Sequence, residues 1–234
     1  MREYAAAVQP LQTLEKARTL VSQLGLRGTG THVARKLLTT VPGGVASRIF
    51  FIVLTTPRPT PAAAEAAKNH TFRFATLADI ERLKNDPSTK LFDRDVESMK
   101  TGNRCLLQYD RERLVGYTWI AGSRLVELMW GMHFNLADDL VYNYNGFTHP
   151  DYRGTAFQAL RHLKVLELTR DEGTRRLFGY VDHLNYNSLR GTQKSGYQPV
   201  GSLRGVKRNG RISFHLDVET HAWSELTRVG PRQG

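Results

Sequence analysis

The chain has 234 residues, of which 40% are hydrophobic and 9% aromatic, enough for one packed domain with an extension. Its single cysteine excludes an internal disulfide, and its eight histidines never take a zinc-ligand spacing with that cysteine, so no metal is expected. Residues 1–10 lack a signal-peptide layout, and the longest apolar run, 49–54, is far shorter than the ~20 residues that span a bilayer, which predicts a cytoplasmic protein.

The formal net charge of +11 indicates an anionic partner or simply a solvated basic surface. Nucleic acid, an anionic membrane surface and a phosphorylated ligand are the three candidate partners. The basic residues do not gather on a recognisable nucleic-acid module, and no basic patch is interleaved with aromatic residues. We therefore expect no nucleic-acid partner.

Residues 1–68 are predicted to form a basic, partly helical N-terminal extension. Apolar residues recur at helical spacing over 10–24, and a second short helix is expected at 33–38. A peripheral contact with an anionic membrane and a helical lid on the main domain both fit this segment. A buried strand is expected at 49–55, and the Pro- and Ala-rich stretch 57–68 is predicted to be a linker.

The main domain is predicted to cover 69–220, followed by a C-terminal tail at 221–234. Strands and helices alternate in it, which is typical of an α/β or α+β layer fold. An Asn-Gly pair at 209–210 indicates a hairpin turn between the last two strands. The expected strands are 71–75, 104–109, 114–121, 140–148, 176–181, 197–206 and 211–218, and the expected helices are 77–84, 92–100, 155–172 and 188–195.

The join between a strand and a helix at 147–154 reads Phe-Thr-His-Pro-Asp-Tyr-Arg-Gly. A helix that begins here leaves its first backbone N–H groups unpaired, so a pyrophosphate could accept several hydrogen bonds from them. Arg153 adds a full positive charge, and Gly154 allows close approach of the backbone. An ordinary strand-to-helix turn is the competing interpretation. On the helix, Arg161 is predicted to face water.

A second segment, 185–197, carries Asn185, Ser188, Lys194 and a Gly-Tyr pair. Together the two segments resemble the GNAT acetyltransferase superfamily, and the similarity covers 71–218. The resemblance implies a mixed, mostly antiparallel sheet flanked by helices, which splits between the strands 140–148 and 176–181. It also implies acetyl-CoA or another acyl-CoA as the donor, with its pantetheine arm in the split.

The resemblance further implies the residues of the donor site. Strand backbone around residue 147 would pair with the pantetheine arm, loop amides would hold the pyrophosphate, and the second segment would line the other side. The cofactor-binding residues implied in this way are Phe147, Thr148, Arg153, Gly154, Thr155, Ala156, Phe157, Gln158, Asn185, Ser188, Arg190 and Lys194.

Two positions depart from the family pattern. The family loop usually reads Arg-x-x-Gly-x-Gly or Ala, whereas here Ala156 and Gln158 replace the glycines, and Gln158 puts a long side chain where a phosphate meets bare backbone. Many relatives carry a tyrosine acid at the position of Thr192, and a threonine is a poor acid. Weaker acyl-CoA binding, or a donor on an acyl carrier protein, would follow from the altered loop. The proton for the departing thiolate would have to come from water or another residue.

For the chemistry, a general base must accept the proton of an attacking amine. Asp139 is the candidate base, directly or through water, and Asn143 and Asn145 are candidates to orient water or substrate. Val141, Asn143, Asn145 and Phe147 are expected to share one face of their strand. The plainer interpretation is that Asp139 only begins that strand.

The predicted function is transfer of an acyl group from acyl-CoA to an amine by direct attack in a ternary complex. The amine would belong to a small molecule, an amino sugar or a peptide. The alternatives are a non-catalytic module that binds acyl-CoA or an acyl carrier, and an assembly factor held at the membrane by its basic N-terminal segment. A homodimer is the default expectation for such an enzyme.

Overall fold

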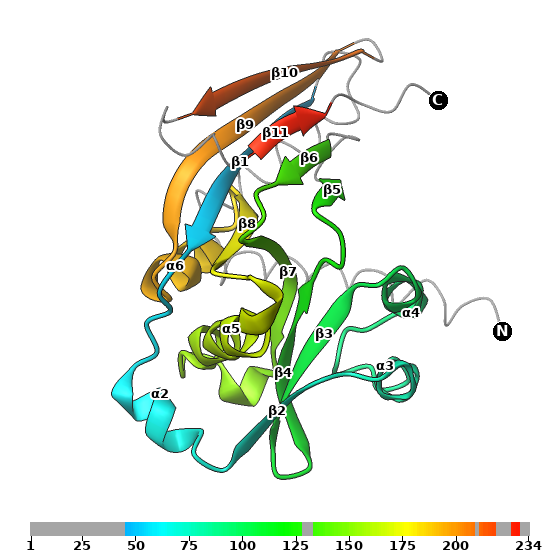
Figure 1. Cartoon of the computed structure of the whole chain (residues 1–234), viewed down its shortest axis with the longest axis vertical. Helices are drawn as coiled ribbons and strands as arrows, with labels where there is room; N and C mark the ends of the chain where they lie inside the picture. The colour runs from blue at the N-terminus through cyan, green and yellow to red at the C-terminus, as the bar shows by residue number, and fades with distance from the viewer. Residues whose placement is uncertain (1–44, 128–132, 209–210, 219–225, 230–234) are drawn as a thin grey trace, which may run out of the picture. The chain divides into compact units, whose positions relative to one another are not determined.

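The computed structural model of the chain describes residues 45–127, 133–208, 211–218 and 226–229 (Figure 1). The predicted helices at 10–24 and 33–38 and the turn at 209–210 lie outside these residues. The described residues form two compact units. The first contains 45–50, 181–190, 202–208 and 211–217, and the second contains 51–127, 133–180, 191–201, 218 and 226–229.

The chain alternates between strands and helices, as the sequence predicts. In chain order the elements are β1 (Val45–Leu54), α2 (Pro61–Ala66), β2 (His70–Phe74), α3 (Leu77–Leu83), α4 (Asp93–Lys100), β3 (Arg104–Asp110), β4 (Arg113–Ile120), β5 (Leu125–Glu127), β6 (His133–Leu136), β7 (Leu140–Thr148), the 3-10 helix η1 (Pro150–Tyr152), α5 (Phe157–Leu168), the 3-10 helix η2 (Arg170–Glu172), β8 (Arg176–Asp182), α6 (Tyr186–Lys194), β9 (Gln198–Arg208), β10 (Arg211–Val218) and β11 (Leu226–Val229).

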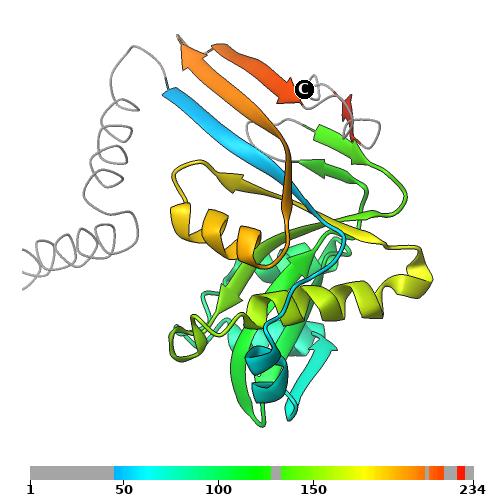
Figure 2. The ribbon, with the colours of Figure 1, turned by 90° about the vertical axis from the view of Figure 1, so that its left-hand side faces the viewer.

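The second unit is built on a sheet whose strands follow the order β8, β7, β4, β3, β2. β7 and β8 run parallel, whereas the pairs β4/β7, β3/β4 and β2/β3 are antiparallel. Figures 1 and 2 show α5 on one face of these strands and α3 and α4 on the other. This arrangement confirms the predicted mixed, mostly antiparallel sheet flanked by helices.

A smaller sheet in the same unit has the strand order β11, β6, β5. Its strand β11 belongs to the segment that the sequence predicts to be a C-terminal tail, and it pairs with β6 from Leu226 opposite Leu136 to Val229 opposite His133. The expectation of a tail is therefore wrong for these four residues. In the first unit the neighbouring strands are β10, β9 and β1.

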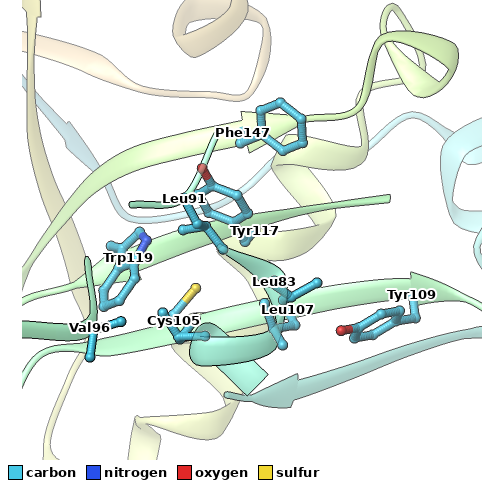
Figure 3. Packing of buried hydrophobic residues seen from close by; sticks show 10 residues of the cluster. Leu83, Leu91, Val96, Cys105, Leu107, Tyr109, Tyr117, Trp119 and Phe147 are labelled. Carbon is cyan, nitrogen blue, oxygen red and sulfur yellow. The ribbon is translucent and has the colours of Figure 1, made fainter. Parts of the chain in front are cut away.

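The face of the sheet under α3 and α4 carries the main apolar core (Figure 3). Alternate residues of β3 and β4 point into it, which is how a strand buries one face. Cys105 is fully buried in this core, and burial raises the pKa of its thiol, as expected for a buried thiol without a catalytic role. The buried members are Ile80, Leu83, Leu91, Val96, Cys105, Leu107, Tyr109, Tyr117, Trp119 and Phe147.

The segment predicted to be a linker contains the helix α2. Thr60 caps it by accepting a hydrogen bond from the Ala63 amide at 3.1 Å, and a proline occupies its first turn, which suits a helix start. Ala63 and Ala67 pack against Phe157 in a second apolar cluster under α5. The linker interpretation is wrong here because the small alanines let this helix pack closely. Among the described residues, no helix combines the length and apolar content needed to cross a bilayer.

Candidate active site

β7 carries a one-residue bulge near its centre. Trp119 pairs with Tyr144, whereas Tyr117, two residues earlier on β4, pairs with Phe147, three residues further along β7. Asn145, inside the bulge, has a φ of 46°, which a residue other than glycine seldom adopts. Because side chains alternate along a strand, the extra residue turns Phe147 to the same face as Tyr144.

The prediction that alternate residues from 141 to 147 share one face is therefore wrong. Phe147 stacks on Tyr117 in the core under α3 and α4, with 5.2 Å between the ring centroids. Asn143 lies on the opposite face, where its Oδ1 accepts a hydrogen bond of 2.7 Å from the Thr118 hydroxyl. Strict alternation places Phe147 on the wrong face because it does not allow for the bulge.

β7 and β8 separate after a short stretch of pairing. Their backbones pair from Leu140 opposite Arg176 to Tyr142 opposite Phe178, although β7 continues to Thr148. In the described part of the chain, the second half of β7 thus leaves one edge open to an added extended chain. This separation agrees with the split that the resemblance implies and gives the second unit a GNAT-like fold.

The loop between β7 and α5 exposes the start of the helix. α5 begins at Phe157 and not at Thr155, with Ala156 as its N-cap in a left-handed conformation and no side chain capping it. Gly154 has a φ of 81°, and no atom lies within 4 Å of the point where a Cβ would stand. Arg153 is exposed and donates from Nε to the Thr148 carbonyl at 3.3 Å. The start of α5 therefore has no side-chain cap, and the exposed Arg153 precedes it in the same loop.

Gln158 reaches across from α5 toward the bulge of β7 and the last turns of α6. A methyl group at Gly146 would lie 3.8 Å from the Gln158 amide nitrogen, and one at Gly191 would lie 3.7 Å from its amide oxygen. Both distances are ordinary van der Waals contacts, so the carboxamide fits between two side-chain-free backbone positions. The structure thus places this side chain near Gly146, in the half of β7 that does not pair with β8.

A buried arginine lies beneath the same loop. Arg161 is fully buried and donates to the Gln108 amide oxygen at 2.8 Å and to the Thr148 hydroxyl at 2.6 Å, while its Nε has no hydrogen-bond partner in the described part of the chain. Burial lowers its pKa to about 10, so it stays charged at neutral pH. No ion pair to Arg161 occurs among the described residues.

Arg161 corrects the expectation that this position faces water. Its place on α5 follows from helix periodicity, because Phe157, Arg161 and Val165 recur every fourth residue and all three are buried. That spacing was a signal that the sequence already contained. Gly116 makes room for the guanidinium, since a Cβ there would lie 2.8 Å from Arg161 Nη1 and 2.3 Å from the Phe147 carbonyl oxygen.

Asp139 forms a bidentate ion pair with Arg176. Its Oδ1 and Oδ2 each accept a hydrogen bond of 2.7 Å from Nη2 and Nε of that guanidinium. This pairing holds the pKa of Asp139 below its usual range, which makes the carboxylate a weaker base. The Asp139 carbonyl also accepts from the Arg176 amide at 3.0 Å, so the residue fixes the start of β7 beside β8.

Asn145 points instead to a carboxylate that sequence reasoning missed. Its Nδ2 donates to Asp95 Oδ1 at 3.3 Å, and the Phe92 amide donates to Asp95 Oδ2 at 2.8 Å. Asp95 is only 5% exposed, and no ion pair to it occurs in the described ranges. Its place as the third residue of α4 is the available sequence signal, because an acid there caps the helix. Asn143 is buried too, and its Nδ2 has no hydrogen-bond partner among the described residues.

The second motif is divided between the two units. Asn185, Ser188 and Arg190 belong to the first unit. The Asn185 side-chain oxygen accepts from the Ser188 amide at 3.1 Å, and its carbonyl accepts from the Leu189 amide at 2.9 Å, so it begins α6. Contact of these three residues with a donor stays a prediction.

The rest of that motif lies in the second unit. Lys194 is exposed, whereas Thr192 is buried and its carbonyl accepts from the Tyr197 amide at 3.0 Å. Gly196 has a φ of 100°, which ends α6 in the left-handed conformation that glycine favours. Tyr197 then packs edge-on against His162. The Gly-Tyr pair thus has a structural role in ending the helix and anchoring it.

The loop residues fit a diphosphate ester such as the CoA part of an acyl-CoA. Gly154 has open space where a side chain would stand, Ala156 leaves the start of α5 uncapped, and Arg153 supplies positive charge. Such uncapped helix starts bind phosphate groups through their amides. Among the described residues, no cluster of three or more His, Cys, Asp or Glu side chains could hold a metal ion.

No protein-family model and no curated protein matches the chain. Among solved structures, a functionally unknown conserved protein from Staphylococcus epidermidis is 12% identical, with a TM-score of 0.43 over 80% of this chain and 67% of that one. A protein assigned to the GNAT acetyltransferase family from Novosphingobium aromaticivorans is 12% identical, with a TM-score of 0.43 over 76% and 69%. AAC(6')-Iy, in complex with a bisubstrate CoA analogue, is 15% identical, with a TM-score of 0.43 over 55% and 90%.

Proposed function

We propose that the chain is an N-acyltransferase that moves an acyl group from acyl-CoA to an amine. The observation that carries the proposal is the uncapped start of α5 beside the open edge of β7. An anion site and an unpaired strand edge at one place suit a ligand with a diphosphate at one end and an amide-bearing chain at the other. Acyl-CoA has this layout, and it supplies an activated carbonyl and a thiolate leaving group.

The donor side of the site rests on the loop and the residues beneath it. Arg153 and the first amides of α5 would hold the diphosphate. Arg161 lies below them and is hydrogen-bonded to Thr148, whose carbonyl accepts from Arg153. A buried positive charge acts over a longer range than an exposed one because water does not screen it, so Arg161 would strengthen anion binding without touching the ligand.

The acceptor side rests on the bulge of β7. Asp95 and Asn145 meet at this bulge, and Asp95 is a buried carboxylate without a cationic partner among the described residues. A protonated amine would supply the missing positive charge. Asp95 would then take the proton that the amine must lose before it attacks the acyl carbon. Asp139 is less suited to this role because Arg176 holds its carboxylate in an ion pair.

A non-catalytic module that binds acyl-CoA or an acyl carrier protein is the second candidate. Gln158 favours it, because its carboxamide lies beside the strand edge that a donor would use. Thr192 favours it as well, because a buried threonine is a poor acid for the leaving thiolate. The amine class, the acyl length and a homodimer stay predictions, and membrane contact through residues 1–68 falls mostly on residues outside the described ranges.

Titration calorimetry with acetyl-CoA and longer acyl-CoAs, followed by a thiol-release assay over a panel of amines, separates these functions. An N-acyltransferase binds a donor and releases free thiol only when a suitable amine is present. Tight binding without release on any amine, including amino sugars and peptides, would select the module. Absence of binding to every acyl-CoA would rule out both.

Asp95→Asn tests the acceptor side. General-base catalysis contributes about 10²- to 10⁴-fold to a rate, so kcat should fall by that order while donor binding stays unchanged. Asp93→Asn is the matched control, because Asp93 begins the same helix with its side chain 91% exposed. Equal activity of Asp95→Asn and the wild type, with both proteins folded by circular dichroism, would remove Asp95 from the mechanism.

A further inference from the structure

Gln158 stands at a place that the proposed function would need for the donor. Its carboxamide lies between the bulge of β7, at Gly146, and α6, at Gly191. All three residues belong to the second unit. Neither glycine has a side chain, and the Gln158 carboxamide lies in contact range of the points where their Cβ atoms would stand.

The neighbourhood of that carboxamide is polar and incompletely hydrogen-bonded. The Thr118 hydroxyl lies 3.8 Å from the point where a Gly146 methyl would stand, the same distance as the Gln158 amide nitrogen. Thr118 bonds to Asn143 Oδ1, and the buried Nδ2 of Asn143 has no partner in the described part of the chain. A buried amide donor of this kind is costly unless an acceptor satisfies it.

An extended arm that pairs with the second half of β7 has to pass Gly146. The polar groups beside Gly146 suit an arm that carries amides, as pantetheine does. The Gln158 carboxamide lies in contact range of the points where Cβ atoms would stand at Gly146 and Gly191, so an arm that passes Gly146 on this side would compete with it for the same space.

We propose that Gln158 is a donor-selecting residue whose side chain occupies the path of the pantetheine arm and must swing away when a donor binds. This inference rests on the proposed function. The side chain lowers the fraction of molecules that can accept the arm, so it weakens the affinity for any ligand that carries one. A ligand that reaches only the phosphate loop is unaffected.

The test compares two ligands on two variants. The ligands are CoA, which carries the arm, and adenosine 3′,5′-bisphosphate, which carries phosphates but no arm. The variants are Gln158→Ala and the control Gln193→Ala, which removes the same side chain from an exposed position on α6. Calorimetry on the wild type and both variants gives six dissociation constants, and thermal melts verify that each protein is folded.

Gln158→Ala should bind CoA about three- to tenfold more tightly than the wild type, the scale of one ordinary hydrogen bond. Its affinity for adenosine 3′,5′-bisphosphate should not change, and Gln193→Ala should change neither. Weaker or unchanged CoA binding by Gln158→Ala would overturn the inference. So would an equal change for both ligands, because Gln158 would then act at the phosphates.

Gly191→Ala gives a second, independent test. Its methyl group would lie 3.7 Å from the Gln158 amide oxygen, so it should confine the carboxamide and weaken CoA binding. If the effect passes through Gln158, it should shrink in the double variant with Gln158→Ala. An undiminished effect there would count against the inference. Absence of CoA binding in the wild type and in every variant would instead show that the proposed function itself is wrong.

Discussion

The two faces of the central strands bury different mixtures of side chains. Under α3 and α4, β3 and β4 present Cys105, Leu107, Tyr117 and Trp119 to a continuous apolar core. Under α5, the same strands present the polar side chains Gln108 and Thr118, with Arg161 between the helix and the sheet. Strand alternation buries both faces, but the face under α5 combines these polar groups with a smaller apolar cluster that includes Val115 and Phe157.

The difference shows which face buries mainly apolar groups and which also buries polar and charged ones. Apolar burial contributes about 25 cal/mol of stabilising free energy for each Å² removed from water. The apolar face under α3 and α4 therefore contributes much of the free energy that stabilises the fold. The face under α5 holds a charged guanidinium and amides without full sets of partners, which cost stability. Under the proposed function, these polar groups lie on the donor side of the site.

Trp119→Ala should leave a cavity in the apolar core under α3 and α4 and should lower the free energy of unfolding more than the other variants. Trp119 is fully buried in that core, and truncating a buried tryptophan costs about 3–5 kcal/mol. Urea unfolding followed by circular dichroism measures the loss. Leu168→Ala is the control, because Leu168 is 46% exposed and should cost less than about 0.5 kcal/mol. Comparable losses for the two variants would contradict the assignment of the core.

Arg161→Met should have an intermediate effect on stability and a clear one on binding. Methionine removes a costly buried charge but leaves Gln108 Oε1 and the Thr148 hydroxyl without their donor, so we expect a loss of about 1–3 kcal/mol. The affinity for adenosine 3′,5′-bisphosphate should fall with it. If binding is unchanged while stability falls, the guanidinium serves only packing, and the contrast between the two faces is weaker than we infer.

Asp139→Asn should have the smallest effect, since this ion pair is only half-buried. The free energy of unfolding should fall by about 1 kcal/mol or less at neutral pH. Because Arg176 lowers the pKa of Asp139 in the folded state, the stabilisation is present above the ordinary carboxyl pKa of about 4 and is lost as pH falls through the folded value. The difference in the free energy of unfolding between the variant and the wild type should therefore disappear at acidic pH. A collapse of kcat in a folded Asp139→Asn protein would restore Asp139 as the base.

Local signals in the sequence predict many of the elements well. The polar turn after β3 and the glycine after α6 are positions where backbone chemistry leaves few choices, and the structure has the hairpin and the helix end there. The start of α5 is predicted within two residues. The linker prediction for 57–68 fails because its prolines and alanines suit a helix start and a close contact as well as they suit a flexible segment.

The site itself was less predictable. Strand alternation predicts Phe147 on the same face as Asn143, but the one-residue bulge in β7 puts the Phe147 side chain on the opposite face. Arg161 was expected in water, although its spacing from Phe157 and Val165 placed it inside. Asp95 was not singled out at all, because its meeting with Asn145 joins residues 50 positions apart. Contacts at that separation depend on how strands pair and helices pack, and a single sequence does not record either directly.

The sequence by itself determined the alternation of strands and helices and the glycine-bearing loop before a helix, because periodicity and turn chemistry act over a few neighbouring residues. The mixed sheet followed from its resemblance to a known family. Tertiary structure alone decided which face each side chain of β7 occupies, which carboxylate is paired, and that Gln158 lies between Gly146 and Gly191. Those outcomes depend on a register shift and on close approaches between distant segments. Steric fit and the pairing of buried polar groups settle them only when the chain is folded.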